Sequence, residues 1–188
     1  MTSPKRIIIG ISGASGAIYG IRTLQLLREL GIETHLVISH TARQVIAAET
    51  DWQITDLEAL ASHAYQPDDL AAPIASGSFH TDGMLVIPCS IKTLSGIANS
   101  YAENLLQRAA DVCLKEGRPL LLAVREAPFH AGHLRLMEQA TLSGAVIFPP
   151  VPSFYSKPTS LEQVIDQTIG RMFLRIGIEN PYYKVWSE

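Results

Sequence analysis

Short apolar runs alternate with segments of helical periodicity along almost the whole chain. The runs predict buried strands at residues 6–10, 33–38, 84–87, 120–124 and 145–148. The periodic segments predict helices at 17–30, 41–50, 104–116, 130–143 and 159–176, with further helices after Gly96 and from Thr55. Residues 65–79 contain prolines and a glycine and are expected to form a loop. Short strands that alternate with helices are typical of an α/β fold, in which a parallel sheet is sandwiched by helices.

Two helix starts have a recognisable capping pattern. Thr55 is followed three residues later by Glu58, and Thr159 by Glu162. In such a capping box the hydroxyl and the carboxylate each satisfy a backbone N–H group of the first helical turn. We therefore expect helices to begin at Thr55 and at Thr159.

Two strand–loop–helix units are built alike. Residues 10–16 follow the first strand and residues 88–96 follow the third, and both loops consist largely of glycine, serine and threonine. A loop of this kind leaves backbone N–H groups at a helix N-terminus, where the helix dipole favours an anion. Ligands of parallel sheets bind beyond the carboxyl ends of the strands. Together the two loops predict a site for a phosphate-bearing ligand, most simply a nucleotide.

The end of the second strand narrows the choice of nucleotide. Dinucleotide-binding proteins place an acidic residue there for the ribose hydroxyl, whereas this chain has Ser39. The spacing of Gly10, Gly13 and Gly16 also departs from G-x-G-x-x-G, and tight packing of strand against helix is a second explanation for these glycines. The sequence disfavours NAD and leaves a mononucleotide such as FMN open.

Other common nucleotide and nucleophile motifs do not occur in the sequence. It contains no G-x-x-x-x-G-K-[ST] and no G-x-S-x-G. His130 and His133 lie three residues apart in a predicted helix, but no further ligand type is near them in sequence, so we expect surface histidines and no metal. Lys92 and the pair Arg125–Glu126 could bind or neutralise an anion, or could be ordinary solvated charges and a structural ion pair.

The composition sets the broad class. The chain has 188 residues, which we interpret as one domain spanning 1–188, and 47% of them are apolar but only 18% charged. An average soluble protein has about 25% charged residues, so a homo-oligomer that covers part of the surface is expected. The net charge of −3 disfavours nucleic acid. Two distant cysteines and the absence of a long apolar run lead us to expect a cytoplasmic protein with no membrane partner.

A set of short motifs along the whole chain resembles one known family, the UbiX/Pad-type flavin prenyltransferases. The motifs that match it in order are Gly13-Ala14-Ser15-Gly16, Glu49-Thr50-Asp51, Ala75-Ser76-Gly77-Ser78, Pro88-Cys89-Ser90, Lys92-Thr93-Leu94, Arg108-Ala109-Ala110-Asp111, Lys115-Glu116, Arg125-Glu126-Ala127-Pro128 and Phe154-Tyr155. The chain differs from some relatives at Leu70, where they have a tryptophan, and at Arg135. The resemblance implies a flavodoxin-like or Rossmann-like three-layer fold and a homododecamer with sites between subunits.

The resemblance also implies a reaction. The family joins a dimethylallyl group from dimethylallyl monophosphate to N5 and C6 of reduced FMN, and a UbiD-type decarboxylase uses the prenylated FMN. Because the monophosphate is a poor leaving group and no metal is expected, cationic and phenolic donors would have to stabilise the departing charge. A carboxylate could take the proton from C6.

The family's functional residues correspond to positions of this chain in three groups. The residues that would hold FMN are Gly13, Ala14, Ser15, Ser39, Ser90, Ile91, Lys92, Thr93 and Arg125. The residues that would surround the prenyl phosphate are Lys115, Arg125, Tyr155 and Arg171, some of them from a neighbouring subunit, with Trp186 packed to close the pocket. The residues that would manage protons are Ser15, Glu49 and Glu126.

Two other functions remain as alternatives. An FMN-dependent cysteine decarboxylase would share the flavin-binding fold, but the sequence lacks the Pro-x-Met-Asn-x-x-Met-Trp clamp of those enzymes. A non-catalytic flavin carrier would have no use for Lys115, Tyr155 and Arg171 together.

Overall fold

A computed structural model describes residues 5–186. Its sheet is parallel, with the strand order β3-β2-β1-β4-β5-β6. The strands are β1 (Arg6–Ile11), β2 (Glu33–Ile38), β3 (His63–Tyr65), β4 (Gly83–Cys89), β5 (Leu120–Val124) and β6 (Val146–Ile147). The helices are α1 (Ala17–Glu29), α2 (His40–Glu49), α3 (Ile54–Leu60), the 3-10 helix η1 (Pro73–Ala75), α4 (Ile91–Ala98), α5 (Leu105–Lys115), α6 (Ala131–Leu142) and α7 (Leu161–Arg175).

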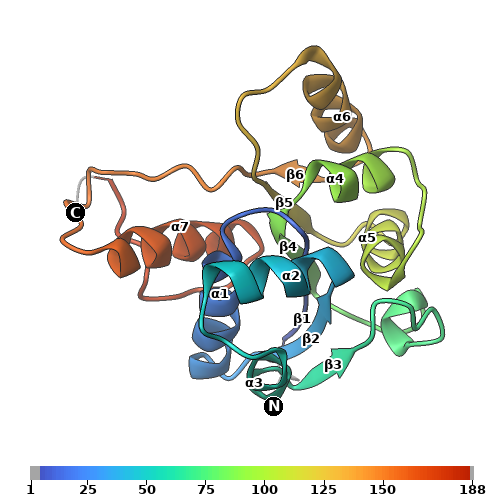
Figure 1. Cartoon of the computed structure of the whole chain (residues 1–188), viewed down its shortest axis with the longest axis horizontal. Coiled ribbons are helices and arrows are strands. Elements are labelled where there is room, and N and C mark those ends of the chain that lie inside the picture. Colours follow the sequence, from blue (N-terminus) through green and yellow to red (C-terminus); the bar gives the residue numbers. More distant parts are fainter. Residues whose placement is uncertain (1–4, 187–188) are drawn as a thin grey trace.

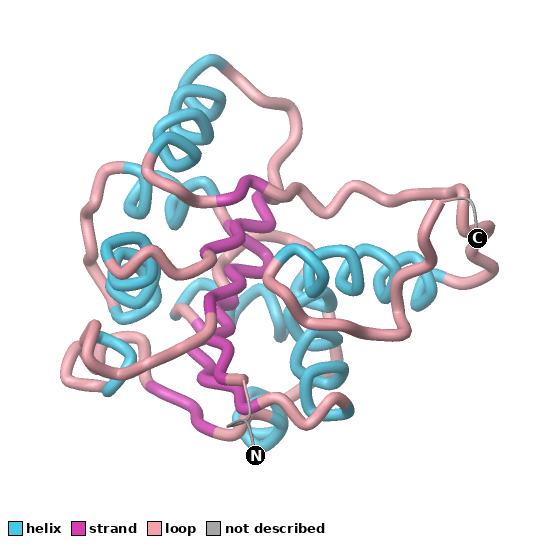
Figure 2. Tube along the Cα trace, turned by 180° about the vertical axis from the view of Figure 1, so that it is seen from behind, coloured by secondary structure: helices cyan, strands magenta, loops and turns pink. Residues whose placement is uncertain are grey.

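Helices cover both faces of this sheet (Figures 1 and 2). Successive side chains of a strand point to opposite faces, so Ile7 and Ile9 pack with α1, α2, α3 and α7 while Ile8 packs with α4, α5 and α6. The two apolar clusters explain why the central strands β1, β4 and β5 are apolar at nearly every position rather than at alternate positions. The predicted α/β fold with a sandwiched parallel sheet is confirmed.

Several predicted boundaries are correct and others are wrong. β2 and β5 have the predicted bounds, whereas β4 extends to Cys89 and α4 already begins at Ile91, so most of the predicted loop 88–96 is helix. We did not predict β3, because its three residues, His63, Ala64 and Tyr65, form no apolar run. In the described chain no helix is long and apolar enough to cross a membrane.

Neither capping box lies where the sequence predicts it. α3 begins after Gln53 without a side-chain cap, so Thr55 lies inside the helix. α7 is capped one residue later than expected, because the side chain of Ser160 accepts from the Gln163 N–H group and the Gln163 side chain accepts from Thr159. The N-cap of α3 thus lies two residues before the predicted one, and that of α7 lies one residue after it.

A buried serine joins the two loops that the sequence singles out. Ser12 follows β1 and donates from Oγ to the carbonyl oxygen of Pro88 over 2.9 Å. The same Oγ accepts from the backbone N–H of Ser90 over 2.7 Å, and the Ser12 N–H also donates to Pro88. The β1–α1 loop and the β4–α4 junction are therefore fixed to each other by three hydrogen bonds.

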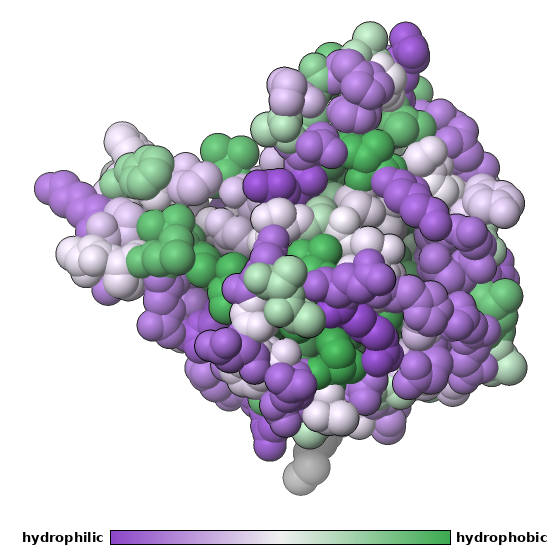
Figure 3. Space-filling view, in the orientation of Figure 1, coloured by the Kyte–Doolittle hydropathy of each residue, from purple (hydrophilic) through white to green (hydrophobic). Residues whose placement is uncertain are grey.

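α7, the extended segment 148–160 before it and the segment 176–186 after it form an arm that projects from the sheet (Figure 1). Figure 3 shows green, apolar side chains on this arm at the left of the view. Its large exposed apolar residues are Val151, Phe154, Leu161 and Trp186, each about 70% exposed (from 68% to 73%). Trp186 is largely exposed in the single chain but contacts the Tyr155 ring, so its expected role of closing the pocket stays a prediction.

Replacing Ser12 by alanine should destabilise the fold. The change leaves the Ser90 N–H group without its acceptor in a buried place, and a lost buried partner costs about 1–3 kcal/mol. Urea unfolding of Ser12→Ala should show a fall of that size in the free energy of unfolding. The control is Ser143→Ala, because the exposed Ser143 hydroxyl donates to Gln139 within one helix, and its effect should stay within about 0.5 kcal/mol. Equal effects of the two changes would contradict the role of Ser12.

Candidate functional site

A cleft of about 420 Å³ opens at the carboxyl ends of β1, β2, β4 and β5. The strand order changes direction between β1 and β4, which is where parallel sheets bind their ligands. The cleft is lined by Gly13, Ser39, His40, Thr41, Asp68, Ser90, Ile91, Lys92, Thr93, Glu103, Asn104, Gln107 and Glu126. Seven of these residues were predicted from the sequence, and the volume lies within the usual range of small-molecule sites.

Two of the helices that begin at the cleft, α2 and α4, are capped by a serine. Ser39 caps α2 by accepting from the Ala42 N–H over 3.2 Å, and Ser90 caps α4 by accepting from the Thr93 N–H over 3.3 Å. The remaining N–H groups of each first turn have no partner within the helix. Because both helix dipoles direct their positive ends here, the cleft favours a phosphate group.

Gly13 lets the β1–α1 loop lie close to α2. A Cβ atom at Gly13 would be 2.5 Å from Cγ2 of Thr41, which is far too close for any side chain. Gly16 ends the same loop with a φ of 97°, a backbone conformation that favours glycine. The loop therefore exposes its backbone to the cleft.

Ser15, Glu49 and Arg125 form a cluster at the start of α1. Oε2 of Glu49 accepts from the N–H groups of Gly16 and Ala17 at 2.8 and 3.0 Å. Partial burial by itself would raise the pKa of Glu49, but the hydrogen bonds from Ser15, Gly16 and Ala17 and the charge of Arg125 outweigh it and lower the pKa. Glu49 is thus an ionised carboxylate that caps α1 and holds the Ser15 hydroxyl.

The charged side chains of the cleft are mostly paired. Lys92 lies 3.2 Å from Glu103, and His40 lies 2.8 Å from Asp68. Oε1 of Glu126 accepts from the N–H of Ala127, its own neighbour in sequence. The attraction for an anion therefore comes from the helix N-termini more than from net charge.

A second pocket of about 220 Å³ lies on the arm and contains Tyr155 and Arg171. The Tyr155 hydroxyl donates to the Tyr183 hydroxyl over 2.8 Å, and Gln167 donates to Tyr155 over 3.3 Å. The guanidinium of Arg171 lies 5.4 Å from the centre of the Tyr183 ring. The hydrogen bond from Tyr155, followed by burial, raises the pKa of Tyr183. Trp186 meets Tyr155 edge to face at 5.1 Å.

Lys115 lies apart from both pockets. It ends α5 and forms an ion pair with Glu116 beside Gly77. α5 begins at the cleft with Asn104 as its cap, so at 1.5 Å per residue Lys115 is about 16 Å away along the helix. Within one chain, the residues predicted to surround the prenyl phosphate thus lie apart: Lys115 at the end of α5, Arg125 beside Glu49, and Tyr155 with Arg171 in the arm pocket.

Several residues of the two pockets were not predicted. Thr41, Asn104 and Gln107 line the cleft, and Tyr183 holds Tyr155 on the arm. The predicted helix start at Asn104 was a usable signal, because a helix beginning beside a strand end faces the same cleft. No sequence signal places Tyr183 against Tyr155, since 28 residues separate them.

The chain is similar to known flavoproteins in sequence and in structure. A family model described as Flavoprotein matches residues 1–172. Flavin prenyltransferase UbiX of Escherichia coli (strain K12) is 59% identical over 178 residues, which are 94% of this chain and 94% of that protein.

Two crystal structures are similar over nearly the whole chain. AnUbiX (PadA1) in complex with FMN and dimethylallyl pyrophosphate has a TM-score of 0.96 and 46% identity, with 98% of each chain covered. The dodecameric FMN-dependent Ubix-like decarboxylase from Escherichia coli O157:H7 has a TM-score of 0.94 and 45% identity, with 97% of this chain and 100% of that chain covered.

Glu49 should make stability depend on pH in a defined direction. Its pKa is lower in the folded chain than the value of about 4.3 in an unfolded one. Its contribution is therefore complete above about pH 4.3 and is lost as the pH falls through the folded pKa. The difference in free energy of unfolding between the wild type and Glu49→Gln should be constant above about pH 6 and shrink below about pH 4.

Urea unfolding at a series of pH values measures this difference. Ser15→Ala removes one of the donors to Glu49 and should reduce the pH dependence in part. A difference that grows as the pH falls would contradict the assignment.

Proposed function

Because this chain belongs to the flavin prenyltransferases of the flavoprotein family, we propose that it joins a dimethylallyl group from dimethylallyl monophosphate to N5 and C6 of reduced FMN. The observation behind this proposal is the cleft at the switch point of the sheet, into which two helix N-termini and a glycine loop open. The product, prenylated FMN, would serve a UbiD-type decarboxylase. The comparison with AnUbiX supports FMN as the flavin, because that protein was crystallised with it.

The donors of the cleft fit a mononucleotide. Ser39 stands where a dinucleotide enzyme has an acid, and the N–H groups near Ser90 and Thr93 suit one phosphate group. Gly13 leaves the backbone of its loop within reach of a flat ligand, because no side chain fits there. In this proposal the N–H groups of the β1–α1 loop and of α4 bind FMN, with Arg125 at the edge.

The prenyl phosphate would bind where charge and phenol groups meet. Arg171 and Tyr155 share the arm pocket and could stabilise the departing phosphate by charge-assisted hydrogen bonds. Lys115 lies at the far end of α5, so its participation requires a neighbouring subunit. The exposed apolar residues of the arm support such an assembly, because patches of this kind are usually covered by a partner. We propose a homododecamer, like the Escherichia coli O157:H7 protein.

The acidic residues would have different tasks. Glu49 already accepts several hydrogen bonds, so it would hold Ser15 and relay its proton. Glu126 is exposed in the cleft and can accept the proton that leaves C6 when aromaticity is restored. Neither task requires a metal ion.

Anaerobic incubation with reduced FMN tests the proposal. With dimethylallyl monophosphate as donor, mass spectrometry of the released flavin should show FMN plus one dimethylallyl group. The rate should not change with EDTA, because no metal ligand is among the residues proposed to bind the phosphate. Dimethylallyl pyrophosphate, with which AnUbiX was crystallised, should give a clearly lower rate. Unmodified flavin in every reaction would refute the proposal.

The same preparation distinguishes the competing functions. One of the two structural relatives is named a decarboxylase, so release of carbon dioxide from a phenolic acid or a C-terminal cysteine should be measured as well. We expect none from this chain without a partner. Carbon dioxide release without flavin modification would favour a decarboxylase, and flavin binding with neither reaction would favour a carrier.

Tyr155 and Arg171 should affect transfer without affecting FMN binding. Hydrogen bonds to a charged group are worth about 1.5–3 kcal/mol, so Tyr155→Phe and Arg171→Ala should each slow single-turnover prenylation about 10- to 150-fold. The arginine change should be the larger because it also removes a charge. The control is Arg175→Ala, one turn further along α7 at its exposed end. If a variant loses FMN but keeps the wild-type rate of transfer per bound flavin, the residue binds the flavin and not the prenyl phosphate.

A further inference from the structure

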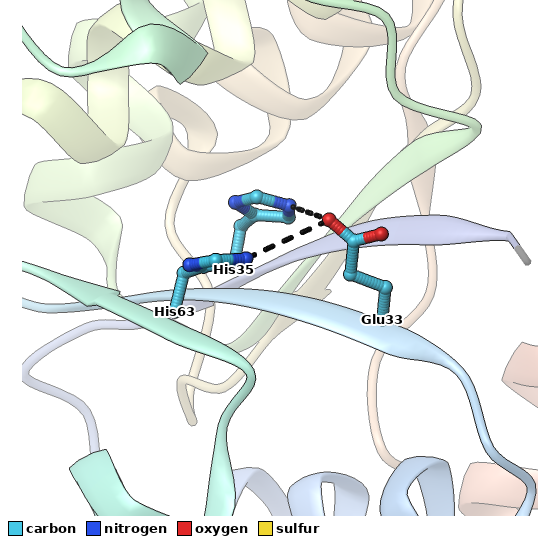
Figure 4. Close-up of side chains that lie close together, drawn as sticks. All are labelled: Glu33, His35 and His63. Carbon is cyan, nitrogen blue, oxygen red and sulfur yellow. Dashed lines mark hydrogen bonds and ion pairs between the residues drawn. The ribbon is translucent and has the colours of Figure 1, made fainter.

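Three side chains converge in the amino-terminal half of β2 and at the start of β3 (Figure 4), whereas the cleft lies at the carboxyl ends of the strands. Oε1 of Glu33 lies 3.1 Å from Nε2 of His35 and 3.7 Å from Nε2 of His63. One donor atom from each residue lies within 4.8 Å of the others. Ligand atoms of a tetrahedral zinc ion are about 3.3 Å apart, given bonds of about 2.0–2.1 Å.

Strand pairing brings the three residues together. His35 is the register partner of His63 in the parallel pair β2–β3, so the two side chains lie on the same face. Glu33 is two residues before His35 and shares that face. The two imidazole rings stack at 4.8 Å with an angle of 20°. The convergence thus follows from backbone geometry that the sheet holds in place.

The buried histidine is already oriented as a metal ligand. Its side chain is 1% exposed, and its Nδ1 lies 2.9 Å from the Tyr65 hydroxyl while Nε2 faces Glu33. A partner at the second ring nitrogen is the usual device that fixes the tautomer of a metal-binding histidine. Burial lowers the pKa of His35 and keeps it neutral, which is the form that binds metals.

We propose that Glu33, His35 and His63 bind a transition-metal ion, with zinc as the best fit and a fourth position open to solvent. The opening is on the side of His63, whose side chain is 55% exposed. Two imidazoles and one carboxylate suit zinc, cobalt or nickel, whereas magnesium and calcium prefer oxygen ligands. Histidine pairs near in sequence, such as His130 and His133, do not show this arrangement. Because strand pairing creates the site, spacing alone could not predict it.

One neighbouring charge opposes the metal. Nε of Arg6 donates to the same Oε1 of Glu33 over 2.9 Å, and the guanidinium also lies over the Phe79 ring. The positive charge reduces the attraction of the site for a cation. Replacing Arg6 should therefore strengthen metal binding, whereas replacing a metal ligand should weaken it.

The site is separate from the proposed reaction. Glu33 is the first residue of β2, and Ser39, which lines the cleft, follows its last residue. At 3.3 Å per residue the two are about 20 Å apart. A bound ion would connect the short edge strand β3 to β2 and stabilise that edge. Prenyl transfer and zinc binding can thus succeed or fail independently.

Isothermal titration of the tag-free protein with zinc chloride, and with cobalt chloride followed by visible spectroscopy, tests the proposal. We expect one zinc ion per chain, a rise in Tm with zinc, and no response to magnesium or calcium. His63→Ala should weaken binding by more than about 100-fold, because even outer-shell changes cost 10- to 100-fold. His80→Ala is the matched control, since His80 is 75% exposed and pairs with Asp82. Both cysteines are buried and should not compete.

Arg6→Gln should tighten zinc binding about 2- to 5-fold, the size of one nearby ion pair. Arg28→Gln removes the same charge from an exposed position and should leave the affinity unchanged. The proposal is overturned if zinc does not bind, if His63→Ala binds as tightly as the wild type, or if His80→Ala weakens binding as strongly as His63→Ala. Because His63 is exposed, its variant should fold, and circular dichroism checks that it does.

Discussion

The buried hydroxyl of Ser12 is the contact on which the rest of the site depends. It connects the end of β1 with the end of β4, the two strands between which the chain changes its direction of winding. Backbone hydrogen bonds also join the neighbouring strand ends, because the Ser39 N–H donates to the Ile11 carbonyl and the Arg125 N–H donates to the Cys89 carbonyl. A rigid edge results, and the glycine loop and both helix N-termini are held against it. An anion that binds there meets donors that need no rearrangement.

The two pockets differ in how complete they are within one chain. The cleft draws its walls from four strand ends and has its capping residues in place. The arm pocket has a cation and a phenol, but the third predicted phosphate ligand, Lys115, lies at the opposite end of α5. This division explains a chain that is poor in charge and exposes large apolar residues on its arm. In the proposed reaction the flavin would bind within one subunit, whereas the prenyl donor would bind between walls supplied by several.

The sequence was informative where a signal is local. β2 and β5 were predicted with their observed bounds, because β5 is a continuous apolar run and β2 ends in the apolar run Leu36–Ile38 just before Ser39. The residues that line the cleft could be predicted from strand ends for the same reason. β3 could not be predicted, since its three residues, His63 to Tyr65, form no apolar run and are a strand only by pairing with β2. Likewise, the partner of Ser12 and the cluster around His35 depend on residues that are distant in sequence and adjacent only in the fold.

The order of the two pockets along the chain has a consequence for biosynthesis. The cleft is lined by residues between Gly13 and Glu126, and the arm pocket by residues between Phe148 and Tyr183. A ribosome therefore releases every residue that lines the cleft before any residue of the arm pocket. During translation the residues of the cleft are available for folding first, and the arm pocket, together with the part of the core that α7 supplies, can only be completed afterwards.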